Sequence, residues 1–207
     1  ARHLKTGESI DQDVEASKKA LLRGCELGDS ASCIDAARTD AMEPPAAIKL
    51  LSEVCDAGHP PACTELGNWL AAGHGASVSH EGAFNAFARA CDQDDTLGCV
   101  RLGAMYEEGI TVAADVTRAR TMYHAACQKG SVEGCFSSAN SLSVDHPGRS
   151  VELFSMVCEK GHALSCDRLA GMVARGDGIE QNLKTAARLL ERACEGGYGP
   201  SCASLGR

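Results

Sequence analysis

The sequence has few aromatic side chains and no long apolar segment. Aromatic residues make up only 4% of the chain, which disfavours a core built from β-sheets. No run of about 18 apolar residues occurs, so we expect no helix that spans a membrane. Residues 1–5 lack the basic and apolar regions of an export signal, and any such signal is expected to lie upstream or to have been removed.

An excess of positive charge is also missing. The chain has 20 lysines and arginines against 28 aspartates and glutamates, a formal net charge of −8. This balance disfavours a protein that binds nucleic acid or an anionic membrane. Hydrophobic residues make up 44% of the chain, which is enough for an ordered core.

Cysteine, in contrast, is abundant. The twelve cysteines form six pairs, and in each pair the second follows the first by eight residues. Zinc sites typically use closer cysteines, and a catalytic cysteine must stay unpaired, so both alternatives are disfavoured. The spacing predicts six disulfides and an oxidising compartment. The expected pairs are Cys25–Cys33, Cys55–Cys63, Cys91–Cys99, Cys127–Cys135, Cys158–Cys166 and Cys194–Cys202.

The pairs recur at intervals of 30 to 36 residues, a period typical of helical repeat proteins. Between pairs the sequence predicts two helices, here named A and B, for example over residues 98–109 and 115–127. We therefore expect residues 1–207 to form a single all-α array of disulfide-linked hairpins. Its units are expected near residues 1–30, 31–60, 61–96, 97–132, 133–163 and 164–199, with a partial unit at 200–207.

Helix B is expected to begin after a capping residue that lies twelve positions before its cysteine. Asp13, Ser79, Asp115 and Asn182 suit this position. In the two units with a shortened turn between helices A and B, Glu43 and His146 stand there instead, each followed by a proline. A glycine shortly after the cysteine is expected to end helix B, at Gly28, Gly58, Gly130, Gly161 and Gly196.

The unit resembles the Sel-one-like repeat, a relative of the tetratricopeptide repeat. The residues that carry the resemblance are Gly-Cys-x-x-Leu-Gly-x-x-Tyr at residues 98–106 and the two cysteines of each unit. With these cysteines the chain is most similar to the bacterial cysteine-rich subfamily first named in Helicobacter. The resemblance implies a right-handed α/α solenoid that presents a concave surface to a protein or peptide partner.

By analogy with tetratricopeptide repeats, two positions of helix A are expected to face this groove. Counted from the second cysteine of each pair, they are +1 and +5. Asparagine amides there could bond a peptide backbone, arginines could take a carboxylate, and Phe136 could line an apolar pocket. The alternative is that these are ordinary exposed residues. The candidates are Thr64, Val100, Phe136 and Asp167 at +1, Arg38, Asn68, Ala104 and Asn140 at +5, and Arg175 farther along its helix.

Three functions stay open. We expect a secreted or periplasmic, monomeric interaction scaffold without catalysis, metal or cofactor. Some relatives are described as binding or weakly hydrolysing β-lactams, but the chain has no Ser-x-x-Lys motif and no zinc-hydrolase motif. His74 and His80 share a loop but lack an evident third metal ligand. The third possibility is a structural spacer in the cell envelope.

Overall fold

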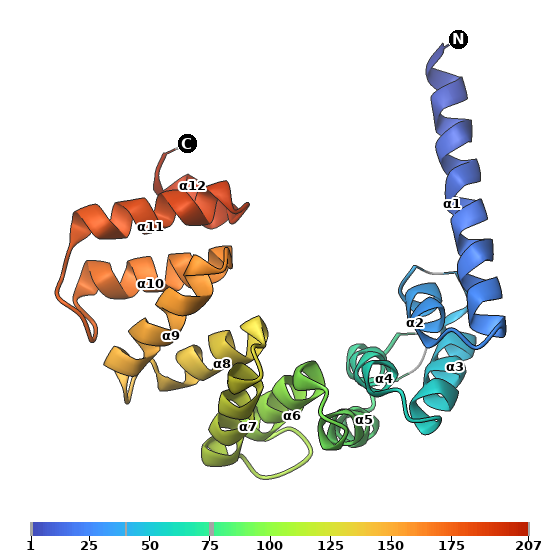
Figure 1. Ribbon diagram of the computed structural model, residues 1–207, viewed down its shortest axis with the longest axis horizontal. Helices are drawn as coiled ribbons and strands as arrows, with labels where there is room; N and C mark the ends of the chain where they lie inside the picture. Colours follow the sequence, from blue (N-terminus) through green and yellow to red (C-terminus); the bar gives the residue numbers. More distant parts are fainter. Residues whose placement is uncertain (1, 40, 75–76, 207) are drawn as a thin grey trace. The chain divides into compact units, whose positions relative to one another are not determined.

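The computed structural model describes residues 2–39, 41–74 and 77–206, with side chains from residue 14 onward (Figure 1). The chain forms two compact units, Ala1–Leu102 with Ile110–Val112, and Gly103–Gly109 with Ala113–Arg207. The described part contains twelve α-helices and no strand. Helices A are α2 (Ser30–Arg38), α4 (Pro60–Ala72), α6 (Thr96–Glu108), α8 (Val132–Leu142), α10 (Ala163–Arg175) and α12 (Gly199–Ser204). Helices B are α1 (Arg2–Glu26), α3 (Pro44–Asp56), α5 (His80–Asp92), α7 (Val116–Gln128), α9 (Pro147–Glu159) and α11 (Leu183–Glu195).

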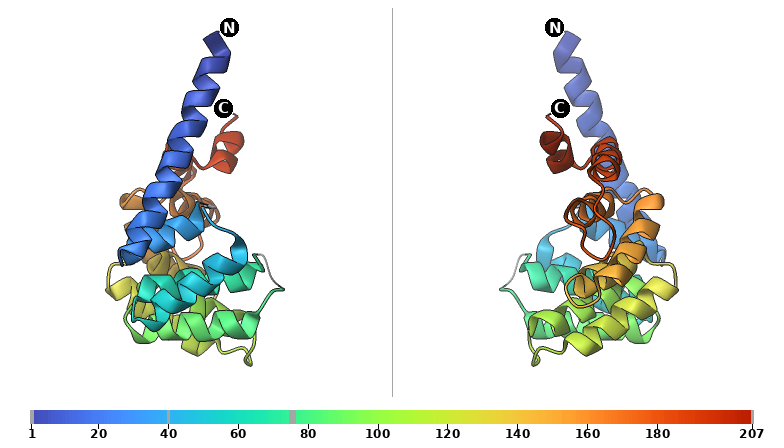
Figure 2. Two further views of the ribbon diagram at one scale, coloured as in Figure 1. Left: turned by 90° about the vertical axis from the view of Figure 1, so that its right-hand side faces the viewer. Right: turned by 90° about the vertical axis from the view of Figure 1, so that its left-hand side faces the viewer.

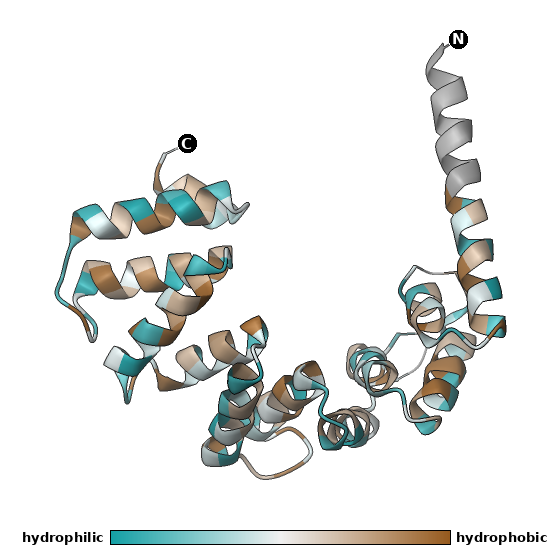
Figure 3. Cartoon of the chain, viewed as in Figure 1, coloured by the Kyte–Doolittle hydropathy of each residue, from teal (hydrophilic) through white to brown (hydrophobic). Residues whose placement is uncertain are grey.

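Helices that follow one another along the chain pack together in each unit, such as α3 with α4 and α10 with α11. Hydrophobic and hydrophilic residues alternate around these helices, as amphipathic packing requires (Figure 3). The repeated packing of helical hairpins confirms the expected all-α solenoid class.

Each of the two compact units has its own core. In the first unit Leu51, Leu66 and Trp69 belong to one buried cluster. In the second, Phe154 and Leu169 lie at the centre of another. Small residues let helices A and B approach closely, because a Cβ added at Gly67 would lie 2.4 Å from the ring of Phe87.

Disulfides link each helix B to the helix A that follows it. All twelve cysteines are paired, and the six pairs are those that the spacing predicts. The two Cα atoms of a pair lie 4.4–4.8 Å apart. Neighbouring hairpins are therefore joined covalently in sequence order.

The expected starts of helices B are confirmed with one exception. Ser79, Asp115 and Asn182 each accept a hydrogen bond from a backbone N–H of the first turn. A proline opens α3 after Glu43 and α9 after His146. The prediction for Asp13 is wrong, since α1 begins at Arg2 and continues through that residue as one helix (Figure 2).

The turn between helix B and the next helix A uses left-handed backbone at one repeated position, three residues after the first cysteine. Gly28, Gly58, Gly130 and Gly161 have φ of 88–89° there. In the last turn Gly197 has the left-handed backbone, at φ 87°, and not the expected Gly196. Gly196 is the C-cap of α11 and has a φ of −74°. The equivalent residue of the third turn is Asp94, at φ 67°.

Gly130→Asp is expected to lower the free energy of unfolding by about 1 kcal/mol, because a residue with a Cβ meets a steric penalty in left-handed backbone that glycine does not meet. Urea denaturation measures the change. Unchanged stability in Gly130→Asp would contradict this account of the turn.

Candidate binding face of helices A

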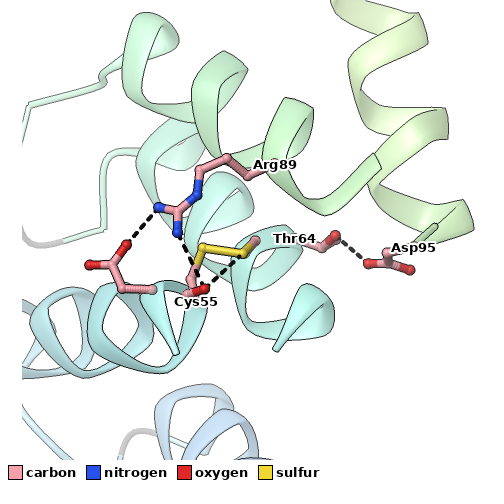
Figure 4. Close-up of a disulfide and its surroundings, with 6 residues drawn as sticks. Cys55, Thr64, Arg89 and Asp95 are labelled. Carbon is pink, nitrogen blue, oxygen red and sulfur yellow. Dashed lines mark hydrogen bonds and ion pairs between the residues drawn. A yellow bond between two sulfur atoms is a disulfide. The ribbon is translucent and has the colours of Figure 1, made fainter. Parts of the chain in front are cut away.

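At Thr64 and Asp167, position +1 of helix A contacts the start of the next helix A and does not lie on an open surface. Thr64 is 2% exposed, and its hydroxyl donates to Asp95, which precedes α6 (Figure 4). The Asp167 carboxylate accepts a hydrogen bond from Ser201 of α12 at 2.6 Å. Val100 is 7% exposed. The expectation that Thr64 and Val100 face a groove is therefore corrected, because both side chains are buried.

Phe136 shares this position and packs within the second unit. Its ring lies 5.8 Å from that of Phe154 and 5.1 Å from that of His162, measured between centroids. His162 is the N-cap residue of α10, the next helix A. Phe136 is half-buried in this aromatic cluster, so most of its surface serves packing.

The open face of helices A runs through positions +2, +5 and +9. These positions are three and four residues apart and therefore lie on one side of a helix. We call this set the open stripe. In the second unit its half-buried or exposed members are Ala104, Glu108, Ser137, Asn140, Arg168, Gly171 and Arg175, together with Val144, which lies in the turn after α8.

In the first unit the open stripe carries an ordered guanidinium group. Nε and Nη2 of Arg38 on α2 donate to Glu65 Oε2 on α4 at 3.0 and 2.9 Å. The Glu65 side chain is only 10% exposed, whereas that of Arg38 is 51% exposed. Arg38 was expected to bind a ligand carboxylate, but the Nε and Nη2 edge of its guanidinium is already bonded to the Glu65 carboxylate. Asn68 lies one turn after Glu65 and is half-buried.

In the second unit the open stripe borders a cavity of about 530 Å³. Arg175, at the C-terminal end of α10, lies in its wall beside Asp177, and their Nε and Oδ2 atoms are 2.7 Å apart. Asn140 lies one turn before the cavity residue Val144 and is exposed. The cavity is lined by Ser143, Val144, Pro147, Met172, Arg175, Asp177 and Gly178.

An arginine from helix B holds the turn that forms one side of this cavity. Arg120 of α7 donates to the Ser141 carbonyl and to Asp145 at 2.5 and 2.6 Å. Hydrogen bonding from Arg120, and then its charge, lower the pKa of Asp145 from its ordinary value. Asp145 therefore stays ionised in mildly acidic solution, and the turn keeps this contact.

Other arginines serve the array itself. Arg89 of α5 donates to the carbonyl of Cys55 at 3.3 Å and pairs with Asp56 at 2.7 Å (Figure 4). Arg192 of α11 makes the equivalent bond to the carbonyl of Cys158 at 3.3 Å. Both guanidinium groups satisfy carbonyls at the C-terminal end of the preceding helix B, where positive charge is favourable.

In the part of the chain that the structure describes, no three histidine, cysteine, aspartate or glutamate side chains gather in a way that could hold a metal ion. No helix in these ranges is long and apolar enough to cross a membrane.

The sequence did not predict the cavity, nor that positions +2 and +9 belong to the open stripe. Arg175 is the exception, since it was predicted as a binding residue. The signal for the cavity was present, because residues 143–146 form the shortened turn of their repeat, while residues 176–182 form a longer one. The cavity lies between these two turns.

Comparison with solved structures shows the same fold. A protective antigen of uropathogenic Escherichia coli with an SLR fold has a TM-score of 0.74 at 22% identity, with 87% of this chain and 41% of that chain covered. A Sel1 repeat protein from Oxalobacter formigenes has a TM-score of 0.75 at 20% identity, covering 86% and 76%. An immunity protein from Pseudomonas aeruginosa has a TM-score of 0.61 at 16% identity, covering 84% and 68%. The chain thus spans less than half of the Escherichia coli protein.

A search of the curated proteins found no match to the sequence. The Sel1 repeat model, in contrast, matches residues 60–95, 96–131 and 163–198. These segments are the hairpins α4–α5, α6–α7 and α10–α11, and together they make up just over half of the chain. The chain belongs to the Sel1 repeat family.

Proposed function

We propose that the protein is a monomeric interaction scaffold without catalysis, which binds an extended segment of a partner protein along the open stripe. We further propose that residues 1–207 act as one array, and that the protein works in the periplasm or outside the cell. Six disulfides support an oxidising compartment, because such bonds persist there and are rare in the cytosol.

The observation that carries this proposal is the polar composition of the open stripe. Asn140 is exposed and Asn68 is half-buried, and neither side-chain amide has a hydrogen bond to another described residue. An amide offers both a donor and an acceptor, which matches the backbone of an extended peptide. Solenoids use extended surfaces of this kind for binding.

Selection of a displayed random-peptide library on the oxidised protein tests the proposal. We expect enriched peptides with dissociation constants in the micromolar range. Asn140→Ala is expected to weaken their binding about three- to tenfold, because a buried backbone group of the ligand loses its partner. Fluorescence anisotropy with labelled peptides measures the affinities.

Gln128→Ala is the matched control, since Gln128 is an exposed amide at the end of helix B α7. It should leave affinity unchanged. Failure to enrich any peptide, or equal losses for both variants, would contradict binding along the open stripe.

A further inference from the structure

We propose that the cavity beside Arg175 binds a carboxylate that stands next to an apolar side chain of a peptide. This inference rests on the proposed peptide-binding function and specifies what one part of the open stripe recognises. The carboxylate could be the end of a chain or the side chain of an aspartate or glutamate.

The guanidinium of Arg175 has an edge that the protein leaves open. Its Nε donates to Asp177, and the two side chains are 65% and 43% exposed. No described residue accepts a hydrogen bond from Nη1 or Nη2. A carboxylate binds two parallel guanidinium N–H groups at once, so these two nitrogens suit it. An exposed pair such as Arg175–Asp177 is weak, and a ligand can share its cation.

Gly171 leaves room for this guanidinium along α10. A Cβ added at Gly171 would lie 3.2 Å from Nη1 of Arg175, which is closer than most Cβ contacts. Gly171 and Arg175 both belong to the open stripe, one helical turn apart. The guanidinium therefore lies over the stripe, in line with a segment bound there.

The rest of the cavity wall combines apolar side chains with polar groups, among them Ser143. Val144 is 87% exposed, and it supplies apolar surface to the cavity together with Pro147 and Met172. Covering such a side chain with an apolar ligand group removes hydrocarbon surface from water. The volume of about 530 Å³ lies in the range of ligand sites and has room for a side chain beside the carboxylate.

Three labelled peptides test the inference on the oxidised full chain. The first is fluorescein-Gly-Gly-Ser-Leu-Leu with a free C-terminal carboxylate, and the second is its C-terminal amide. The third has glutamate in place of the serine and ends as an amide. We expect at least one acidic peptide to bind about tenfold more tightly than the neutral amide, because charged hydrogen bonds are the strong ones. Anisotropy gives the affinities, and the methyl resonance of Met172 reports occupation of the cavity.

Variants separate this site from general charge attraction. Arg175→Gln should abolish the preference for the acidic peptides, and Asp177→Asn should strengthen their binding two- to fivefold by removing a competing carboxylate. Arg188 is an exposed residue of helix B α11, and Arg188→Gln should leave the affinity for all three peptides unchanged.

Acidic and neutral peptides of equal affinity would overturn the inference, as would a preference that survives in Arg175→Gln. If library-selected peptides depend on Asn140 but none prefers a carboxylate, this inference fails and peptide binding stands. A preference in only one acidic peptide identifies the source of the carboxylate.

Discussion

Removal of the disulfide between Cys55 and Cys63 is expected to lower the free energy of unfolding by about 2–5 kcal/mol. Both residues are fully buried, and the bond closes a loop whose ends are 8 residues apart. Loop closure alone accounts for about 2.5 kcal/mol in the chain-entropy estimate. Replacing both cysteines by alanine also leaves a cavity where the sulfurs packed, which adds to the loss.

The matched control is the double alanine variant at Cys194 and Cys202. This disulfide closes a loop of the same length, but both residues are partly exposed. Its loss should therefore be limited to about 2–3 kcal/mol. Urea denaturation of both variants measures the difference. A smaller loss of stability at Cys55 and Cys63 than at Cys194 and Cys202 would contradict the role of burial.

Phe154→Ala is expected to lower the free energy of unfolding by about 3–5 kcal/mol, because truncation of a buried aromatic leaves a large cavity. Phe154 is 1% exposed and belongs to the core cluster of the second unit with Leu169 and Val173. Helices of a repeat array contact mainly their neighbours, so the damage should be local. Hydrogen exchange should show faster exchange in α8–α11 and little change in α3–α5.

Met156→Ala provides the control on the same helix. Met156 is 40% exposed, so its truncation should change stability by less than about 1 kcal/mol. Equal losses for Phe154→Ala and Met156→Ala would mean that the core of this unit is not where the structure places it.

The cysteine spacing predicts much of the fold. A separation of eight residues across the turn between two helices brings two cysteines within bonding range, and the same separation recurs six times. Local capping signals were also readable, since Ser79 and Asp115 act on their own first turn. The helix start predicted at Asp13 is wrong because aspartate is tolerated inside a helix, and no proline lies in residues 1–43 to interrupt α1.

The binding face was harder to predict because it depends on how one hairpin stacks on the next. Positions +1 and +5 lie within about 40° of each other on a helix, so periodicity does not separate them. The next helix A covers Thr64 near the start of α4, while Asn68, one turn later, is left partly open. Contacts between distant residues, such as Arg38 with Glu65, have no local signature at all.

Disulfide mapping of the non-reduced protein by mass spectrometry tests the central claim of this account, the covalent linkage of each hairpin to the next. We expect six bridged peptides, each joining cysteines 8 residues apart, and no reactive thiol after denaturation. Free thiols, or bridges between cysteines of distant repeats, would contradict it.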